Sequence, residues 1–227
     1  MQNDTFIVTG GGSGSGLAIA RSLAERGARV EVWGRSAAKL EAAVACGCAA
    51  DLQTVDLAQA DQVNEAFQSF DRKHRRLSGF VHSAGIWTPG PLTEVPPDVV
   101  VSHIAAVVTA AALCLRGAAR RLLEHGGPMV LIAAASAKAG FTDTALNTLA
   151  KRSNDGLHEG LLRELRGSGV KLTTIYPDSM SGPDSPSIAQ GKAMRYDDVA
   201  EAVLFALTAA PTVHVQEIVL TAPGTGR

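Results

Sequence analysis

The chain has 227 residues, of which 46% are hydrophobic and 19% are charged, and its formal net charge is -1. This length and composition fit a single globular domain with a substantial core, and the near-neutral charge argues against nucleic acid as the main partner. Three cysteines, Cys46, Cys48 and Cys114, cannot all pair, which favours a reducing, cytoplasmic setting.

Targeting, membrane and metal signals are weak in this sequence. Residues 1–4 lack the pattern of a signal peptide, and no run reaches eighteen consecutive apolar residues. The six histidines have no metal-ligand spacing, and the basic run at 72–76 is typical of a solvated helix end. We therefore expect a soluble, cytoplasmic protein with no membrane contact and no metal site.

A glycine-rich turn follows the first apolar run, at 6–8, and precedes an alanine- and leucine-rich stretch at 17–25. Its small residues are Gly10, Gly12, Ser13, Gly14, Ser15 and Gly16. Between a strand and a helix, such glycines allow positive φ and let a pyrophosphate approach the main chain, while the helix N-terminus attracts the anion. The turn predicts dinucleotide binding.

Short apolar runs and longer helical patterns alternate along the rest of the chain. Strands are predicted at 6–8, 30–33, 53–55, 80–81, 129–132, 172–175 and 218–220, and helices at 17–26, 37–45, 61–70, 98–124, 144–166 and 197–209. Ser36 and Asp197 are candidate N-caps, and Gly27, Gly126 and Gly167 follow helix ends. The alternation predicts an α/β fold: a Rossmann-type doubly wound parallel sheet of about seven strands with helices on both faces, as one domain over 1–227.

The segment 179–191 carries neither period and is predicted to be a loop, because it contains Pro183, Pro186 and several serines. A loop after a late parallel strand lies on the ligand side of such a sheet. We interpret it as a substrate lid, with an ordinary connection as the alternative.

Several motifs occur in an order typical of one family. They are Thr9-Gly10-x-x-x-Gly14-x-Gly16, Asp56 followed by Leu57, His82-Ser83-Ala84-Gly85 in place of Asn-Asn-Ala-Gly, Ser136, Lys151 and Pro177. With these motifs the chain resembles the short-chain dehydrogenase/reductase family over nearly its whole length. The resemblance implies that the glycine turn, Asp56, Leu57, Ser83, Ala84, Gly85, Lys151 and Pro177 bind a nicotinamide cofactor, and that Ser136 and Lys151 belong to a catalytic site.

The residues after the second predicted strand indicate which cofactor is used. An acidic residue there would bind the ribose 2′-OH and repel a 2′-phosphate, whereas this chain has Gly34 and then Arg35. A guanidinium matches phosphate geometry, so we predict NADP(H). A surface arginine at the start of the following helix is the alternative reading.

The resemblance fails at the family's catalytic tyrosine. Asn147 stands four residues before Lys151, and no Tyr-x-x-x-Lys occurs, since the only tyrosines are Tyr176 and Tyr196. An amide can donate a hydrogen bond to a substrate oxygen but cannot supply a proton near neutral pH. His103, at the position of a family asparagine, and Asp178 are the ionisable candidates, with a helix-packing role and a loop-capping role as their alternatives.

Two functions fit these residues. The first is an NADP(H)-dependent oxidoreductase that interconverts a small alcohol and ketone with an altered proton donor, using Ser136, Asn147, Lys151 and His103. The second is a non-catalytic NADP(H)-binding sensor or scaffold. In either case the apolar helices at 98–124 and 144–166 predict a homodimer or homotetramer.

Overall fold

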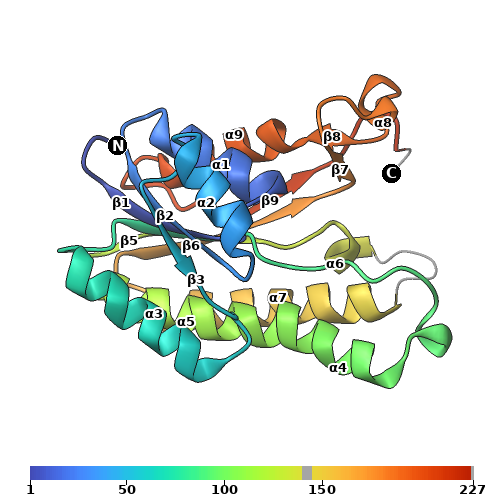
Figure 1. Ribbon diagram of the computed structural model, residues 1–227, viewed down its shortest axis with the longest axis horizontal. Coiled ribbons are helices and arrows are strands. Elements are labelled where there is room, and N and C mark those ends of the chain that lie inside the picture. Colours follow the sequence, from blue (N-terminus) through green and yellow to red (C-terminus); the bar gives the residue numbers. More distant parts are fainter. Residues whose placement is uncertain (140–144, 226–227) are drawn as a thin grey trace.

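Seven parallel strands form one sheet through the middle of the molecule, in the order β3-β2-β1-β4-β5-β6-β9 (Figure 1). The computed structural model describes residues 1–139 and 145–225. The strands are β1 (Thr5–Thr9), β2 (Arg29–Gly34), β3 (Asp51–Thr54), β4 (Gly79–His82), β5 (Gly127–Ile132), β6 (Val170–Pro177) and β9 (Glu217–Leu220). The predicted doubly wound sheet of about seven strands is confirmed.

Helices cover both faces of this sheet (Figure 1). One layer holds α1 (Gly14–Ala24), α2 (Ala37–Ala45) and α9 (Tyr196–Leu207), and the other holds α3 (Ala60–Lys73), α4 (Pro97–Ile104), α5 (Ala110–Leu122) and α7 (Ala145–Glu164). A π-helical stretch, Ala105–Thr109, joins α4 to α5. The predicted helix at 98–124 is therefore one continuous helical segment with a widened turn.

The sheet has a separate core on each face. Along β1, Phe6 and Val8 pack under α1 and α9, while Ile7 packs under α3 and α5. This alternation explains why the central strands appear in the sequence as unbroken apolar runs: both faces are covered.

The chain between β6 and α9 departs from the predicted loop at 179–191. Met180–Ser181 forms a short strand, β7, that pairs with β8 (Met194–Arg195), and Pro186–Ala189 forms a single helical turn, α8. Neither element is long enough to show a period in the sequence, so the prediction missed them.

The predicted helix caps are partly correct. Gly27, Gly126 and Gly167 follow helix ends with φ of 81°, 74° and 79°, as Gly permits. Ser36 is the N-cap of α2, but Asp197 is not a cap, because α9 begins after Arg195, whose backbone N–H donates to Asp198. The predicted start of α7 at Thr144 lies outside the described residues.

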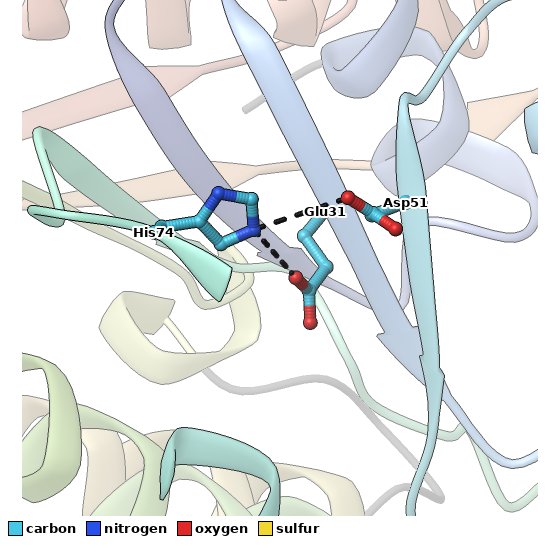
Figure 2. A group of neighbouring side chains, drawn as sticks. All are labelled: Glu31, Asp51 and His74. Carbon is cyan, nitrogen blue, oxygen red and sulfur yellow. Dashed lines mark hydrogen bonds and ion pairs between the residues drawn. The ribbon is translucent and has the colours of Figure 1, made fainter. Parts of the chain in front are cut away.

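A buried acid on β2 interrupts the core. Glu31 is fully buried, and its carboxylate accepts a hydrogen bond from Trp33 Nε1 at 2.9 Å. It also accepts one from His74 Nε2 at 3.1 Å (Figure 2). Asp51 lies beside them, and the three side chains could together hold a metal ion, because their ligand atoms lie within 4.8 Å of one another. Arg29, however, already forms an ion pair with Asp51. The basic run at 72–76 is thus not wholly solvated, because the His74 side chain is buried against this acid.

One helix, Pro97–Leu122, is long and apolar enough to cross a membrane by length and composition alone. Ser102, His103 and Thr109 interrupt its apolar residues, so the count of consecutive apolar residues in the sequence did not reveal it. Its α5 portion packs into the core through Ala111, Leu115 and other residues, while only 33% of its most apolar window is buried.

Candidate cofactor and active site

The glycine turn between β1 and α1 packs directly against the segment that follows β4. A β-carbon on Gly10, which has a φ of 71°, would lie 2.9 Å from the backbone of Ala84, and one on Gly16 would lie 2.3 Å from the Gly10 carbonyl oxygen. The hydroxyls of Ser15 and Ser83 lie 3.1 Å apart and link the two segments. Close backbone contact therefore requires glycine at positions 10 and 16.

Most of the residues predicted to bind a cofactor line a single cavity at the carboxyl ends of the strands. They are Gly10, Ser13, Gly14, Ser15, Arg35, Asp56, Leu57, Ser83, Ala84 and Gly85. Gly12 and Pro177 do not line this cavity. A β-carbon on Gly12 would contact Lys39 and Leu40, and Pro177 ends β6, where its carbonyl accepts a hydrogen bond from Ala135 N. Four motifs distant in the sequence thus meet at one site.

Lys151 lies on α7 beside this cavity. A β-carbon on Gly85 would come within 3.4 Å of the Lys151 ammonium nitrogen. Burial lowers the pKa of Lys151 to about 8, because desolvation disfavours its charged form. This ammonium could donate hydrogen bonds to the hydroxyl or phosphate oxygens of a group bound near Gly85.

Ser136 and His82 are buried near the ends of β5 and β4. The Ser136 hydroxyl and His82 Nε2 find no hydrogen-bond partner among the described residues. His82 Nδ1 lies 2.9 Å from the Thr9 hydroxyl, and burial, assisted by the charge of Lys151, lowers the pKa of His82 to about 3. His82 is therefore a neutral residue that braces β4 against β1, and Ser136 is not among the residues lining the cavity.

Asn147, which we expected at the position of the family tyrosine, contacts the backbone rather than open space. Its side-chain oxygen accepts a hydrogen bond from Thr88 N at 3.1 Å, and its amide nitrogen donates to the Thr88 carbonyl. Asn147 is 1% exposed. Both polar atoms of the amide are thus used to hold the loop that follows Gly85.

The same loop is tied to α4 through a second contact. The Thr88 hydroxyl lies 2.8 Å from His103 Nδ1. Burial, together with the charge of Lys151, lowers the pKa of His103, so its imidazole is neutral at pH 7. Thr88 therefore joins Asn147 on α7 to His103 on α4, and we call these three residues the Thr88 latch.

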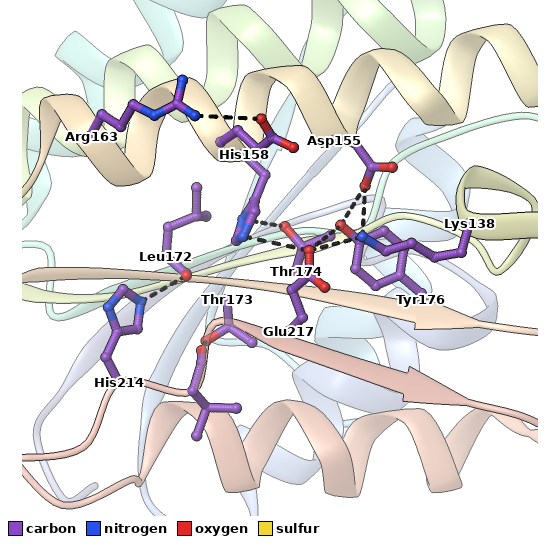
Figure 3. Close-up of polar contacts among 12 residues, drawn as sticks. Lys138, Asp155, His158, Arg163, Leu172, Thr173, Thr174, Tyr176, His214 and Glu217 are labelled. Carbon is purple, nitrogen blue, oxygen red and sulfur yellow. Dashed lines mark hydrogen bonds and ion pairs between the residues drawn. The ribbon is translucent and has the colours of Figure 1, made fainter.

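Tyr176 does not replace the missing tyrosine. Its side chain is buried under α7, and its hydroxyl donates to the carboxylates of Asp155 and Glu217, while Lys138 Nζ lies 4.2 Å from the ring centroid (Figure 3). Burial and the two carboxylates raise the pKa of Tyr176, so the phenol stays protonated. His158 and Thr174 extend this network along β6.

Asp178, the other ionisable candidate, begins the segment after β6. It is 7% exposed, and its backbone N–H donates to the Leu220 carbonyl, which ties the end of β6 to β9. This contact involves the main chain and leaves the role of its carboxylate as a prediction.

Among the site residues missed in the sequence, two have hydroxyl groups, Tyr196 and Thr88. Tyr196, at the start of α9, lines the cavity with its ring 3.8 Å from where a β-carbon on Gly14 would lie. Thr88 sits in a loop without periodicity, and nothing in its local sequence indicates that Asn147 and His103 meet there. In the sequence, Tyr196 stands directly before Asp197 and Asp198, and nothing in that context indicated that it lines the cavity.

The residues present fit a nicotinamide dinucleotide. The turn leaves no room for a side chain at Gly10 or Gly16, the N-terminus of α1 faces the cavity, and the only acidic residue on its described wall is Asp56, which is held by a bond from Ala58 N. Arg35 supplies a cation on the same wall.

Comparison with known families and proteins agrees with this geometry. Residues 4–191 match the family model described as short chain dehydrogenase. An uncharacterized oxidoreductase of Staphylococcus aureus is 32% identical over 221 residues, which cover 93% of this chain and 94% of that protein. A second uncharacterized oxidoreductase, from Staphylococcus saprophyticus, is 29% identical over 230 residues, covering 96% and 97%.

Solved structures show the same likeness. A metagenomic short-chain oxidoreductase in complex with NADP is 29% identical, with a TM-score of 0.84 and 96% of each chain covered. A short-chain dehydrogenase/reductase from Mycobacterium ulcerans is 28% identical, with a TM-score of 0.87, covering 96% of this chain and 88% of that one. An alcohol dehydrogenase from Thermococcus sibiricus, at 20% identity and a TM-score of 0.90 over 100% and 99% of the two chains, shares the fold.

Proposed function

The chain belongs to the short-chain dehydrogenase family and is an oxidoreductase of that type, and from this premise we propose that it interconverts a small alcohol and ketone with NADP(H). The observation that carries the proposal is the convergence of the glycine turn, Arg35 and the segment after β4 on one cavity, with Lys151 beside it. When bound, the nicotinamide supplies or accepts the hydride.

NADP(H) rather than NAD(H) is favoured by the charge at the end of β2. Arg35 follows directly after Gly34, and both line the cavity. Its guanidinium would pair with a 2′-phosphate, and no acid stands at this position to repel one. The relative that was solved with NADP is consistent with this choice.

The Thr88 latch supplies the altered proton donor. An alcohol bound next to Thr88 gives its proton to the Thr88 hydroxyl, which passes its own proton to His103 Nδ1, 2.8 Å away. In the reverse direction, protonated His103 returns a proton through Thr88 to the alkoxide. Lys151 orients the ribose. Ser136 and Asn147 contribute from buried positions, and Asn147 does so by holding Thr88 in place through two hydrogen bonds.

This assignment sets the pH dependence. Because burial and Lys151 lower the pKa of His103, the neutral imidazole needed for alcohol oxidation is present at pH 7. Oxidation is expected to fall as the pH drops through that lowered pKa, and ketone reduction to rise over the same range.

The test is a panel of small ketones and alcohols with NADPH and NADP⁺, measured for the unmodified protein and for His103→Asn. The variant keeps a hydrogen-bonding group facing Thr88 but cannot titrate, so kcat is expected to fall roughly 10²- to 10⁴-fold while NADPH binding is retained. His125→Asn, an exposed histidine at a helix end, is the control. A chain that binds NADPH but turns over no compound would instead be the non-catalytic binding protein.

We further propose that the chain forms a homodimer or homotetramer through α4, α5 and α7. Only 33% of the most apolar window of Pro97–Leu122 is buried, and Val101 and the α7 residue Leu149 are 69% and 56% exposed. An apolar surface of this kind is typical of a subunit interface. Small carbonyl and alcohol compounds remain the proposed partners of the cavity.

A further inference from the structure

Cys46 and Cys48 lie together at the C-terminal end of α2, between Arg35 and Asp56 in the sequence, and neither lines the cofactor cavity. Gly47 between them has a φ of 74° and no atom within 4 Å of where its β-carbon would stand, so the chain reverses there without obstruction. The Ala43 carbonyl oxygen accepts hydrogen bonds from the backbone N–H of Cys48, at 3.0 Å, and from the thiol of Cys46, at 3.3 Å. Both cysteines are therefore fixed around the same atom.

The two thiols differ in environment. Cys46 is exposed, and its hydrogen bond with the thiol of Cys48 lowers its pKa. Cys48 is only 7% exposed, and burial, together with the same hydrogen bond, raises its pKa to about 11. The pair thus presents an accessible sulfur that ionises more readily beside a second, protected sulfur, and an accessible thiol of lowered pKa next to another cysteine is the arrangement of a redox-sensitive pair.

The third cysteine cannot take part. Cys114 is fully buried on α5 within the core on the opposite face of the sheet from α2, and burial raises its pKa. Any reversible thiol chemistry of the native chain therefore belongs to Cys46 and Cys48.

We propose that Cys46 and Cys48 form a redox site that cycles between a dithiol and an intramolecular disulfide. With hydrogen peroxide as oxidant, the Cys46 thiolate attacks one peroxide oxygen, the O–O bond breaks, and Cys46 sulfenic acid and one water form after proton uptake. Cys48 sulfur then attacks the Cys46 sulfur, the S–O bond breaks, and the second water leaves with the Cys48 proton. The two sulfurs lose two electrons and peroxide gains two.

Reduction by a dithiol reverses the cycle. A disulfide that spans a single residue closes a very short ring, and strained, exposed disulfides of this kind have the more oxidising potentials. The oxidised form is therefore expected to be reduced readily by dithiothreitol.

The test compares the unmodified chain with Cys46→Ser, Cys48→Ser and Cys114→Ser, each treated with peroxide and then analysed by intact mass and by thiol counting. The unmodified chain and Cys114→Ser are expected to lose two thiols and two hydrogens of mass, and to regain both with dithiothreitol. Cys48→Ser is expected to stop at a Cys46 sulfenic acid that dimedone traps, and Cys46→Ser to lose no thiol. An unchanged thiol count, a requirement for Cys114, or disulfide-linked dimers in place of the intramolecular product would overturn the proposal.

Discussion

Arg35 is the residue on which the proposed choice of NADP(H) rests. Replacing it with aspartate removes the guanidinium that we propose pairs with the 2′-phosphate and adds repulsion, so Arg35→Asp should weaken NADPH binding by roughly tenfold or more and leave NADH binding equal or tighter. Calorimetric titration of both cofactors measures this. Arg76→Asp, an exposed arginine beyond α3, is the matched control. Equal affinities of the unmodified chain for NADPH and NADH would remove Arg35 from the site.

Lys151, which we propose positions the cofactor, also lowers the stability of the fold because it is buried. Its pKa is lowered to about 8, from 10.5, because burial disfavours the ammonium. Between these values the unfolded chain holds a proton that the folded chain does not, so this residue makes the protein more stable as the pH rises from 8 to 10.5. Below pH 8 the buried charge destabilises the fold.

Lys151→Met should therefore raise the melting temperature at pH 7, abolish that part of the pH dependence, and weaken cofactor binding roughly tenfold or more. Lys138→Met is the contrasting control: burial acts to lower the pKa of Lys138, but Glu217 and Asp155 outweigh it and raise the pKa, so this variant should lower stability. Thermal melts across pH and NADPH titration check both. A destabilised Lys151→Met would contradict the argument.

Individual site residues differed in how far the sequence could place them. Gly10, Ser83 and Asp56 follow strands whose carboxyl ends meet at one edge, so strand prediction alone brought them together. The contacts of Asn147 with Thr88 depend on how α7 packs against a loop of no regular structure, which local patterns do not encode. For the same reason Glu31, an acid in a strand that otherwise appears buried, gave no hint of His74.

At the scale of the element, the turn into α1 tolerates no side chain at Gly16. Gly16→Ala would place a methyl group 2.3 Å from the Gly10 carbonyl oxygen, so the helix and the turn must separate. We expect at least a tenfold loss of NADPH affinity and a lower melting temperature. Gly182→Ala, at a position with open space and no positive φ, should change neither. Wild-type NADPH affinity in Gly16→Ala would show that the turn is not the pyrophosphate site.

Elements with a strong period were predictable, and short or capped ones were not. β1, β2 and β5 are buried on both faces and were found as short apolar runs, whereas α3 is strongly amphipathic and was found by its helical period. The start of α9 was displaced because Asp198, rather than Asp197, closes the first turn onto Arg195. Side-chain capping by an arginine and an acid three residues apart has no simple signature among the usual cap residues.

At the scale of the whole molecule, the proposed association can be tested on α7. Leu149→Glu places a charge on an exposed apolar position and should lower the mass found by light scattering at micromolar concentration. Phe205→Glu, equally exposed but on α9 over the other face of the sheet, should leave a dimer intact. A monomeric mass for the unmodified chain would contradict the proposal.

The Thr88 latch also bears on how such a chain can change over evolutionary time. Asn147 satisfies both the N–H and the carbonyl of Thr88, so the position four residues before Lys151, where the resemblance places a tyrosine, holds a structural contact. A tyrosine at 147 would leave the N–H and the carbonyl of Thr88 unpaired. Its larger ring would also need space that the loop around Thr88 now occupies. Because contacting residues do not act additively, a return to Tyr-x-x-x-Lys must pass through a less stable intermediate or reshape the loop first. Chains with this contact are therefore expected to keep the chemistry that we propose for Thr88 and His103 rather than to regain the tyrosine.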